Sequence, residues 1–118
     1  MDKWVLLVDD NVELLKTAAE LLQAAGYSVL TAKDATDAMQ KTEGVFLGAI
    51  VLDLDLAGED GMMLFKFLKR NQPGVPIILY TGLEHDEEAI AKFLERGAAQ
   101  YLKKGSSDLV QAVKRSFR

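Results

Sequence analysis

The chain has 118 residues, of which 49% are hydrophobic and 27% charged, and its formal net charge is −4 at pH 7. This composition is typical of a globular domain and excludes a disordered chain, while the length allows one packed core. Because there are no cysteines, disulfides, thiolate catalysis and thiolate zinc sites are excluded. The negative charge disfavours direct binding of nucleic acid.

The elements in chain order begin with an apolar strand close to the first residue. Short apolar runs predict five strands, at Trp4–Val8, Tyr27–Ala32, Ala49–Leu52, Pro76–Tyr80 and Ala98–Leu102. The first, third and fourth runs are continuously apolar, which is typical of strands covered on both faces of a parallel sheet. None approaches the roughly 20 apolar residues of a membrane span. With no signal-peptide pattern at its start, we expect a cytoplasmic protein without a membrane partner.

Helical patterns lie between these strands and after the last one. Apolar residues at a spacing of three to four predict helices that contain Val12–Leu22, Leu64–Leu68, Ile90–Leu94 and Leu109–Phe117. Asp34 is expected to cap a further helix over ATDAMQKT, and Gly26, Pro73-Gly74 and Gly97 are the expected stops. Five strands alternating with five helices predict an α/β fold with a doubly wound parallel sheet.

The carboxyl ends of the strands are where such a fold binds ligands. Asp9 and Asp10 follow the first strand and Asp53 follows the third. Three ionised carboxylates in one pocket would repel strongly, and a hard divalent cation such as Mg²⁺ would neutralise them. Thr81-Gly82 and Lys103-Lys104 follow the fourth and fifth strands and are the other candidates for the site.

Four motifs at these strand ends resemble those of the response-regulator receiver domain of two-component signalling. They are VDD at Val8–Asp10, LDLDLAGEDG at Leu52–Gly61, YTG at Tyr80–Gly82 and YLKKG at Tyr101–Gly105, and the resemblance extends from Lys3 to Phe117. It implies a single receiver domain over residues 1–118, with the flavodoxin-like strand order 2-1-3-4-5. It also implies a phosphoprotein that is no enzyme in the usual sense, because it catalyses only its own phosphorylation and slow autodephosphorylation.

The resemblance implies a role for each acidic residue. Asp53 is the phosphoacceptor, and its carboxylate needs no general base because it is already ionised at neutral pH. Asp10 and Asp53 are expected to bind Mg²⁺ directly. The backbone carbonyl of Asp55 completes the protein ligands, and Asp9 acts mainly through water.

The resemblance also assigns the phosphoryl-binding and switch residues. Lys104 brings a positive charge to the phosphoryl oxygens, Thr81 donates its hydroxyl, and the backbone N–H of Gly82 approaches closely because glycine has no side chain. The family places an aromatic residue three positions before the active-site lysine. Tyr101 therefore identifies Lys104 as that lysine, and Lys103 is expected to be a solvated neighbour. On phosphorylation, Thr81 is expected to move toward the phosphoryl group and Tyr101 to turn inward.

Three positions depart from the family pattern. Ala57 and Gly105 stand where proline is usual. A trans Lys104–Gly105 bond is predicted, because a cis bond without proline costs about 2.5–4 kcal/mol. Asp55, two residues after the acceptor, is expected to tune the lifetime of the aspartyl phosphate, in a direction that the sequence leaves open.

Other interpretations of these residues remain open from the sequence. Asp9 and Asp10 could cap the first helix, with Glu13 completing a capping box. Asp53 and Asp55 are similar to the DxD motif of haloacid-dehalogenase-like phosphatases, although that motif's usual hydroxyl residue is missing and the chain is short for that fold. An inert, receiver-like interaction module is the third interpretation.

The resemblance implies protein partners. A histidine kinase or a histidine phosphotransfer protein would supply the phosphoryl group. A downstream protein or effector domain would bind the fourth helix, the fifth strand and the fifth helix, within residues 84–118, and a homodimer through the same face is a further hypothesis. No effector domain is present in the 118 residues. The kinase, the pathway, the output and whether the domain stands alone are not predicted.

Overall fold

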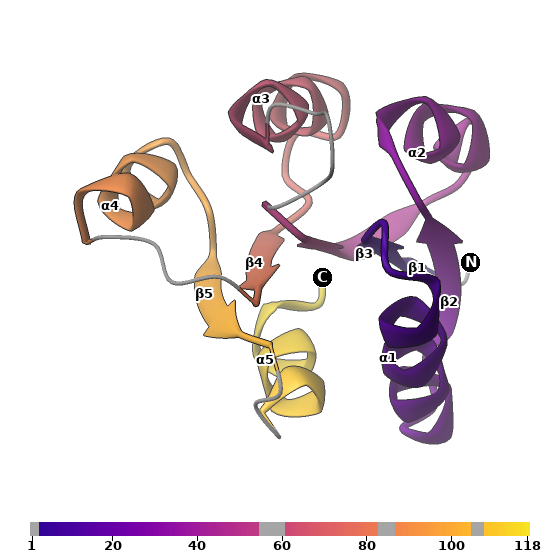
Figure 1. The fold of residues 1–118 in the computed structure, drawn as a ribbon. Helices are drawn as coiled ribbons and strands as arrows, with labels where there is room; N and C mark the ends of the chain where they lie inside the picture. The colour runs from indigo at the N-terminus through magenta and orange to yellow at the C-terminus, as the bar shows by residue number, and fades with distance from the viewer. Residues whose placement is uncertain (1–2, 55–60, 83–86, 105–107) are drawn as a thin grey trace.

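The computed structural model describes residues 3–54, 61–82, 87–104 and 108–118. The strands are β1 (Trp4–Val8), β2 (Ser28–Ala32), β3 (Leu47–Leu52), β4 (Ile77–Thr81) and β5 (Gln100–Lys103), and the helices are α1 (Val12–Ala24), α2 (Ala35–Thr42), α3 (Gly61–Asn71), α4 (Glu87–Glu95) and α5 (Leu109–Ser116). The strands form one parallel sheet in the order β2-β1-β3-β4-β5. Helices α2, α3 and α4 cover one face and α1 and α5 the other (Figure 1). The predicted fold and strand order are confirmed.

The sheet separates two hydrophobic cores, because its central strands are buried on both faces. Leu6 and Ile50 point into the core on the side of α2, α3 and α4, together with Phe65. Their neighbours Leu7 and Val51 point into the core on the side of α1 and α5. Each fully buried side chain of this kind stabilises the fold by about 1.5–3 kcal/mol. The ends of β1 and β3 are therefore firmly placed, and these are the ends that carry the acidic residues.

Side-chain caps set the N-termini of the first two helices. Asn11 Oδ1 accepts hydrogen bonds from two backbone N–H groups in the first turn of α1, each at 3.1 Å. Asp34 Oδ1 accepts one from the first turn of α2 at 2.8 Å, so the predicted cap is confirmed. The interpretation of Asp9 and Asp10 as the caps of α1 is wrong, because Asn11 occupies that position and supplies the oxygen.

Strand β1 has the predicted bounds, and the bounds of the other strands differ from the predicted ones by at most two residues. Strand β3 begins at Leu47 and includes Gly48, β4 extends to Thr81, and β5 begins at Gln100. Helix α1 ends shortly before Gly26, as predicted; the φ of Gly26 is +99°, a conformation that favours glycine. Among the described residues, no helix combines the length and the apolar character needed to cross a bilayer.

Candidate functional site

The backbone of the site continues the hydrogen-bond ladder of the sheet. The N–H of Asp9 donates to the last carbonyl of β2 at 3.0 Å, and that of Asp53 donates to the last carbonyl of β1 at 2.9 Å. The N–H of Lys104 donates to the last carbonyl of β4 at 2.8 Å. The backbone of each of these residues is thus fixed by a hydrogen bond to a neighbouring strand. Fixed backbone positions keep the charged side chains preorganised, which electrostatic stabilisation requires.

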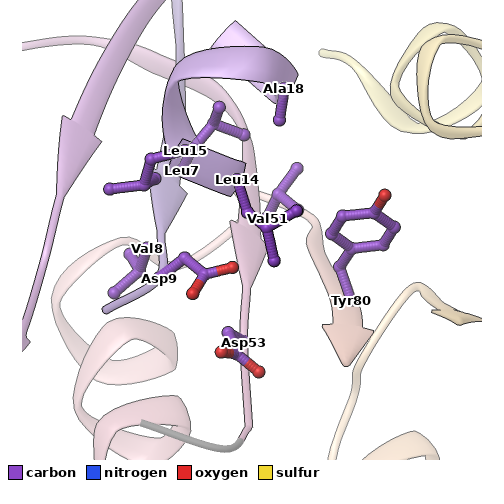
Figure 2. Close-up of a pocket in the computed structure, with 9 residues that line it drawn as sticks. All are labelled: Leu7, Val8, Asp9, Leu14, Leu15, Ala18, Val51, Asp53 and Tyr80. Carbon is purple, nitrogen blue, oxygen red and sulfur yellow. The ribbon is translucent and has the colours of Figure 1, made fainter. Parts of the chain in front are cut away.

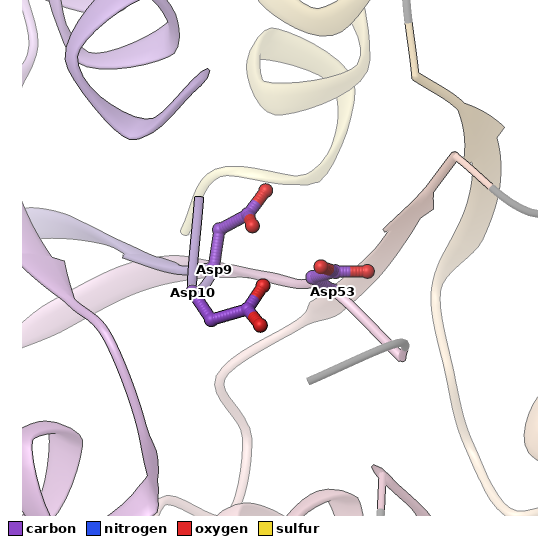
Figure 3. A group of neighbouring side chains, drawn as sticks. All are labelled: Asp9, Asp10 and Asp53. Carbon is purple, nitrogen blue, oxygen red and sulfur yellow. The ribbon is translucent and has the colours of Figure 1, made fainter. Parts of the chain in front are cut away.

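Three carboxylates meet at this edge of the sheet, as the sequence predicted. Asp9 and Asp10 extend from the end of β1 and Asp53 from the end of β3, and one carboxylate oxygen from each lies within 4.8 Å of the other two (Figure 3). Asp9 is 6% exposed and Asp53 only 2%, whereas Asp10 is exposed. Asp9 is further oriented by the backbone N–H of Asn11, which donates to its Oδ1 at 2.9 Å.

Lys104 bridges the two buried carboxylates. Its Nζ lies 2.6 Å from Asp9 Oδ2 and 3.0 Å from Asp53 Oδ2, and the lysine side chain is 13% exposed. Burial by itself lowers the pKa of Lys104, but the hydrogen bonds and charges of Asp9 and Asp53 outweigh it and hold that pKa above its ordinary value. Lys104 is therefore an ammonium group at neutral pH.

The contact between Lys104 and Asp9 was not predicted. The resemblance to receiver domains directs Lys104 to the phosphoryl group and gives Asp9 a role through water. Lys104 follows β5 and Asp9 follows β1, and strands β3 and β4 lie between these two strands in the sheet. The contact therefore depends on a long lysine side chain that spans two strands. No local pattern in the sequence carries that information.

The donor set fits a hard divalent cation. Within the described part of the chain, three carboxylates gather here, and Lys104 contacts two of them, Asp9 and Asp53. Carboxylate oxygens are the ligands that Mg²⁺ takes in proteins, usually one or two of them with several waters. The exposure of Asp10 leaves one side of the cluster open to water. Asp55, whose carbonyl is expected among the ligands, lies outside the described residues. The same holds for Ala57 and for Gly105 with the predicted trans bond.

Thr81 and Tyr101 lie on neighbouring strands and on the same face of the sheet. The register pairs Leu79 with Tyr101 and Thr81 with Lys103, and every second residue of a strand returns to the same face. Thr81 is fully buried, while Tyr101 is half-buried and packs against the core on the side of α2, α3 and α4. Lys103 is exposed, as predicted. The switch roles of Thr81 and Tyr101 stay predictions.

A small and mostly apolar pocket lies beside the two buried acids. Figure 2 shows the carboxylates of Asp9 and Asp53 near the side chains of Val51 and Leu14 and the ring of Tyr80. The pocket holds about 10 Å³, room for roughly one water molecule. It therefore gives the carboxylates an apolar flank and is no substrate cavity.

Comparison with known proteins gives matches over nearly the whole chain. The family model of the response regulator receiver domain matches residues 5–114. The C4-dicarboxylate transport transcriptional regulatory protein DctD of Rhizobium meliloti (strain 1021) is 31% identical over 114 residues, which are 95% of this chain and 25% of that protein. The chain is thus similar to one part of a longer regulator.

Two solved structures are similar in fold. A response regulator from Burkholderia pseudomallei, with a phosphorylated aspartic acid, a calcium ion and citrate, superposes with a TM-score of 0.86 at 27% identity, over 99% of this chain and 67% of that one. The beryllofluoride-activated NtrC4 receiver domain dimer superposes with a TM-score of 0.86 at 30% identity, over 96% and 94%. With its acidic cluster at the expected strand ends, the chain belongs to the response regulator receiver domain family, signalling modules of two-component systems rather than classical enzymes.

Proposed function

We propose that Asp53 accepts a phosphoryl group, with Mg²⁺ bound beside it, from the phosphohistidine of a histidine kinase or a histidine phosphotransfer protein. The observation that carries the proposal is the Asp53 carboxylate itself, which is 2% exposed, lies 3.0 Å from the Lys104 ammonium and belongs to a cluster of three carboxylates. The phosphorylated aspartic acid of the Burkholderia pseudomallei regulator supports it.

The chemistry follows from the positions of these groups. An oxygen of Asp53 attacks phosphorus, the P–N bond of the donor breaks, and its electron pair leaves with the imidazole. When bound by Asp10 and Asp53 directly and by Asp9 through water, Mg²⁺ supplies charge neutralisation for the phosphoryl oxygens. Lys104 adds its ammonium charge to the same oxygens, and the Thr81 hydroxyl donates a hydrogen bond to them.

The response to phosphorylation is proposed to pass through β4 and β5. The aspartyl phosphate adds roughly −1.5 to −2 charge and draws the Thr81 hydroxyl toward it. Tyr101, on the neighbouring strand and the same face, then turns into the space that Thr81 leaves. The surface of α4, β5 and α5, within residues 84–118, is proposed to bind the downstream partner, with a coupling of about 1–3 kcal/mol.

Phosphorylation by a small donor tests the acceptor directly. The protein is incubated with acetyl phosphate, with and without Mg²⁺, and its intact mass is measured. We expect one phosphoryl group per chain in the presence of Mg²⁺ and none for Asp53→Asn. Asp37→Asn, which changes an acid on α2, should behave like the wild type. A phosphoryl gain in Asp53→Asn would show that another residue is the acceptor.

The same reaction separates a receiver from a phosphatase. A receiver stops near one phosphoryl group per chain on the timescale of its slow hydrolysis, whereas a haloacid-dehalogenase-like phosphatase would consume the donor repeatedly. The hydrolysis rate of the aspartyl phosphate in Asp55→Asn tests the proposed tuning role of Asp55, and a rate equal to that of the wild type would remove that role.

A further inference from the structure

We propose that Gly82 is a positioning residue for Lys104, because its missing side chain leaves the space through which the lysine stem reaches Asp9 and Asp53. The inference deepens the proposed function and rests on it for its kinetic part. It adds to the predicted role of Gly82 as a backbone donor to the phosphoryl group, since it concerns the absent Cβ and not the N–H.

The backbone of Gly82 does not require glycine. Four described glycines have a positive φ, which side chains rarely adopt: Gly26, Gly44, Gly74 and Gly97. Gly82 is not among them, and it is exposed. A larger residue at this position would therefore meet no backbone strain, so the reason for glycine has to be sought in its neighbours.

The neighbour is the stem of Lys104. A Cβ placed in ideal geometry on Gly82 would lie 3.3 Å from Lys104 Cδ and 3.9 Å from Lys104 Cβ. Beyond the adjacent residues of the chain, no other described residue has a heavy atom within 4 Å of that point. The shorter distance is tighter than nine in ten real Cβ contacts, so the stem would have to move by a few tenths of an ångström.

The stem has little freedom to move, because Lys104 is held at both ends. Its backbone N–H donates to the carbonyl of Thr81 at 2.8 Å. Its Nζ lies 2.6 Å from Asp9 Oδ2 and 3.0 Å from Asp53 Oδ2. A displacement in the middle of the stem is therefore passed to the ammonium group, where short charge-assisted hydrogen bonds are sensitive to distance and direction.

A double-mutant cycle tests this coupling. The rates of phosphorylation by acetyl phosphate with Mg²⁺ are measured for the wild type, Gly82→Ala, Lys104→Met and the double variant. Alanine keeps the backbone N–H, so only the added Cβ differs. We expect Gly82→Ala to slow phosphorylation roughly threefold to tenfold, a partial loss of a charged hydrogen bond. The same change in the Lys104→Met background should have no further effect. Equal slowing in both backgrounds would overturn the proposal.

A second measurement needs no phosphorylation. The ¹³Cε and ¹⁵Nζ chemical shifts of Lys104 are compared in the wild type and Gly82→Ala at neutral pH, without Mg²⁺ or a phosphodonor. Lys103, the exposed neighbour, provides the matched control signal, and Lys103→Met confirms the assignment. We expect the Lys104 signals to move toward those of a solvated lysine while the Lys103 signals stay. Unchanged Lys104 signals would overturn the inference.

The two measurements distinguish the two proposals. If Lys104 moves in Gly82→Ala but the wild type accepts no phosphoryl group, the positioning role stands and the proposed function fails. If the wild type is phosphorylated on Asp53 but the Lys104 signals do not change in Gly82→Ala, the proposed function stands and the positioning role fails. Gly82→Ser adds the same Cβ and replaces Gly82→Ala should the alanine variant not fold, which far-ultraviolet circular dichroism shows.

Discussion

At the scale of single residues, the described part of the site gathers three carboxylates beside the ammonium group of Lys104. Lys104 is in contact with the two buried carboxylates of Asp9 and Asp53, and Asp10 adds a third negative charge at the exposed side. A buried ion pair contributes little net stability, because removing charges from water costs about as much as the pair regains. The cluster is therefore better explained by its chemistry than by stability.

The convergence of these residues could be predicted, but their pairing could not. Asp9, Asp10, Asp53 and Lys104 each follow a strand, and parallel strands bring their carboxyl ends to one edge. The cap of α1 could also have been predicted, because Asn11 is a strong N-cap residue directly before the helical pattern. The contact of Lys104 with Asp9 depends on how far the lysine side chain extends across the folded sheet. The spacing of residues in the sequence does not predict it.

Alkaline pH should weaken the fold through Lys104. Because its folded-state pKa is raised, its contribution to stability is complete below the unfolded-state lysine pKa of about 10.4 and is lost as the pH rises through the higher folded value. Urea unfolding on either side of about pH 10.4 should show a steeper loss for the wild type than for Lys104→Met. Lys103→Met should follow the wild type. Equal pH dependence of the wild type and Lys104→Met would contradict the expectation.

Magnesium should stabilise the folded protein by binding the clustered carboxylates of Asp9, Asp10 and Asp53. A ligand that binds only the folded state at 100 times its Kd adds about 2.7 kcal/mol to the free energy of unfolding. We expect a gain of this size in urea unfolding with Mg²⁺ and a clearly smaller one for Asp10→Asn. Glu20→Gln changes an exposed acid on α1 away from the cluster and should keep the full gain. The same gain in Asp10→Asn and the wild type would exclude Asp10 as a ligand.

At the scale of elements, the sequence predicts the strands well and their ends less well. Apolar runs locate β1, β3 and β4 because strands buried on both faces must be apolar throughout. The predicted start of β3 at Ala49 left out Gly48, since glycine weakens a strand. In the structure, Gly48 lies within β3 and the ring of Phe117, just after α5, packs over it. A contact between residues so distant in the chain is invisible to local patterns.

Filling the space at Gly48 should destabilise the docking of α5. A Cβ on Gly48 would lie 2.4 Å from the Phe117 ring, and overpacking of this kind costs about 1–3 kcal/mol. We expect this loss for Gly48→Ala in urea unfolding, and a smaller loss when Phe117→Ala is already present, because the clash is then absent. In a Phe46→Ala background, which removes an exposed phenylalanine, the full cost should remain. If Gly48→Ala lost the same stability with and without the Phe117 ring, the ring would not be the reason for glycine at this position.

At the scale of the whole molecule, the site and the proposed partner surface meet at strand β5. Thr81 ends β4 and Lys104 follows β5, so a change at the site acts directly on the edge of the sheet. Helix α4 beside this edge has no buried residue among its nine, whereas each of the other helices has two or three. Helix α4, the helix with the fewest buried residues, therefore belongs to the proposed partner surface. Elements with few buried contacts are the ones that move most easily.

Activation should produce a homodimer through the surface of α4, β5 and α5. The similar NtrC4 receiver domain is a dimer when activated with beryllofluoride, and Leu94 on α4 is 44% exposed. By sedimentation velocity with Mg²⁺, we expect a monomer that becomes a dimer on addition of beryllofluoride. Leu94→Glu should prevent this, because a charge in the apolar centre of an interface costs binding energy. Leu21→Glu, at a 53% exposed leucine on α1, should still dimerise. A treated wild type that stays monomeric refutes the dimer, and dimerisation lost only in Leu21→Glu moves the interface to α1.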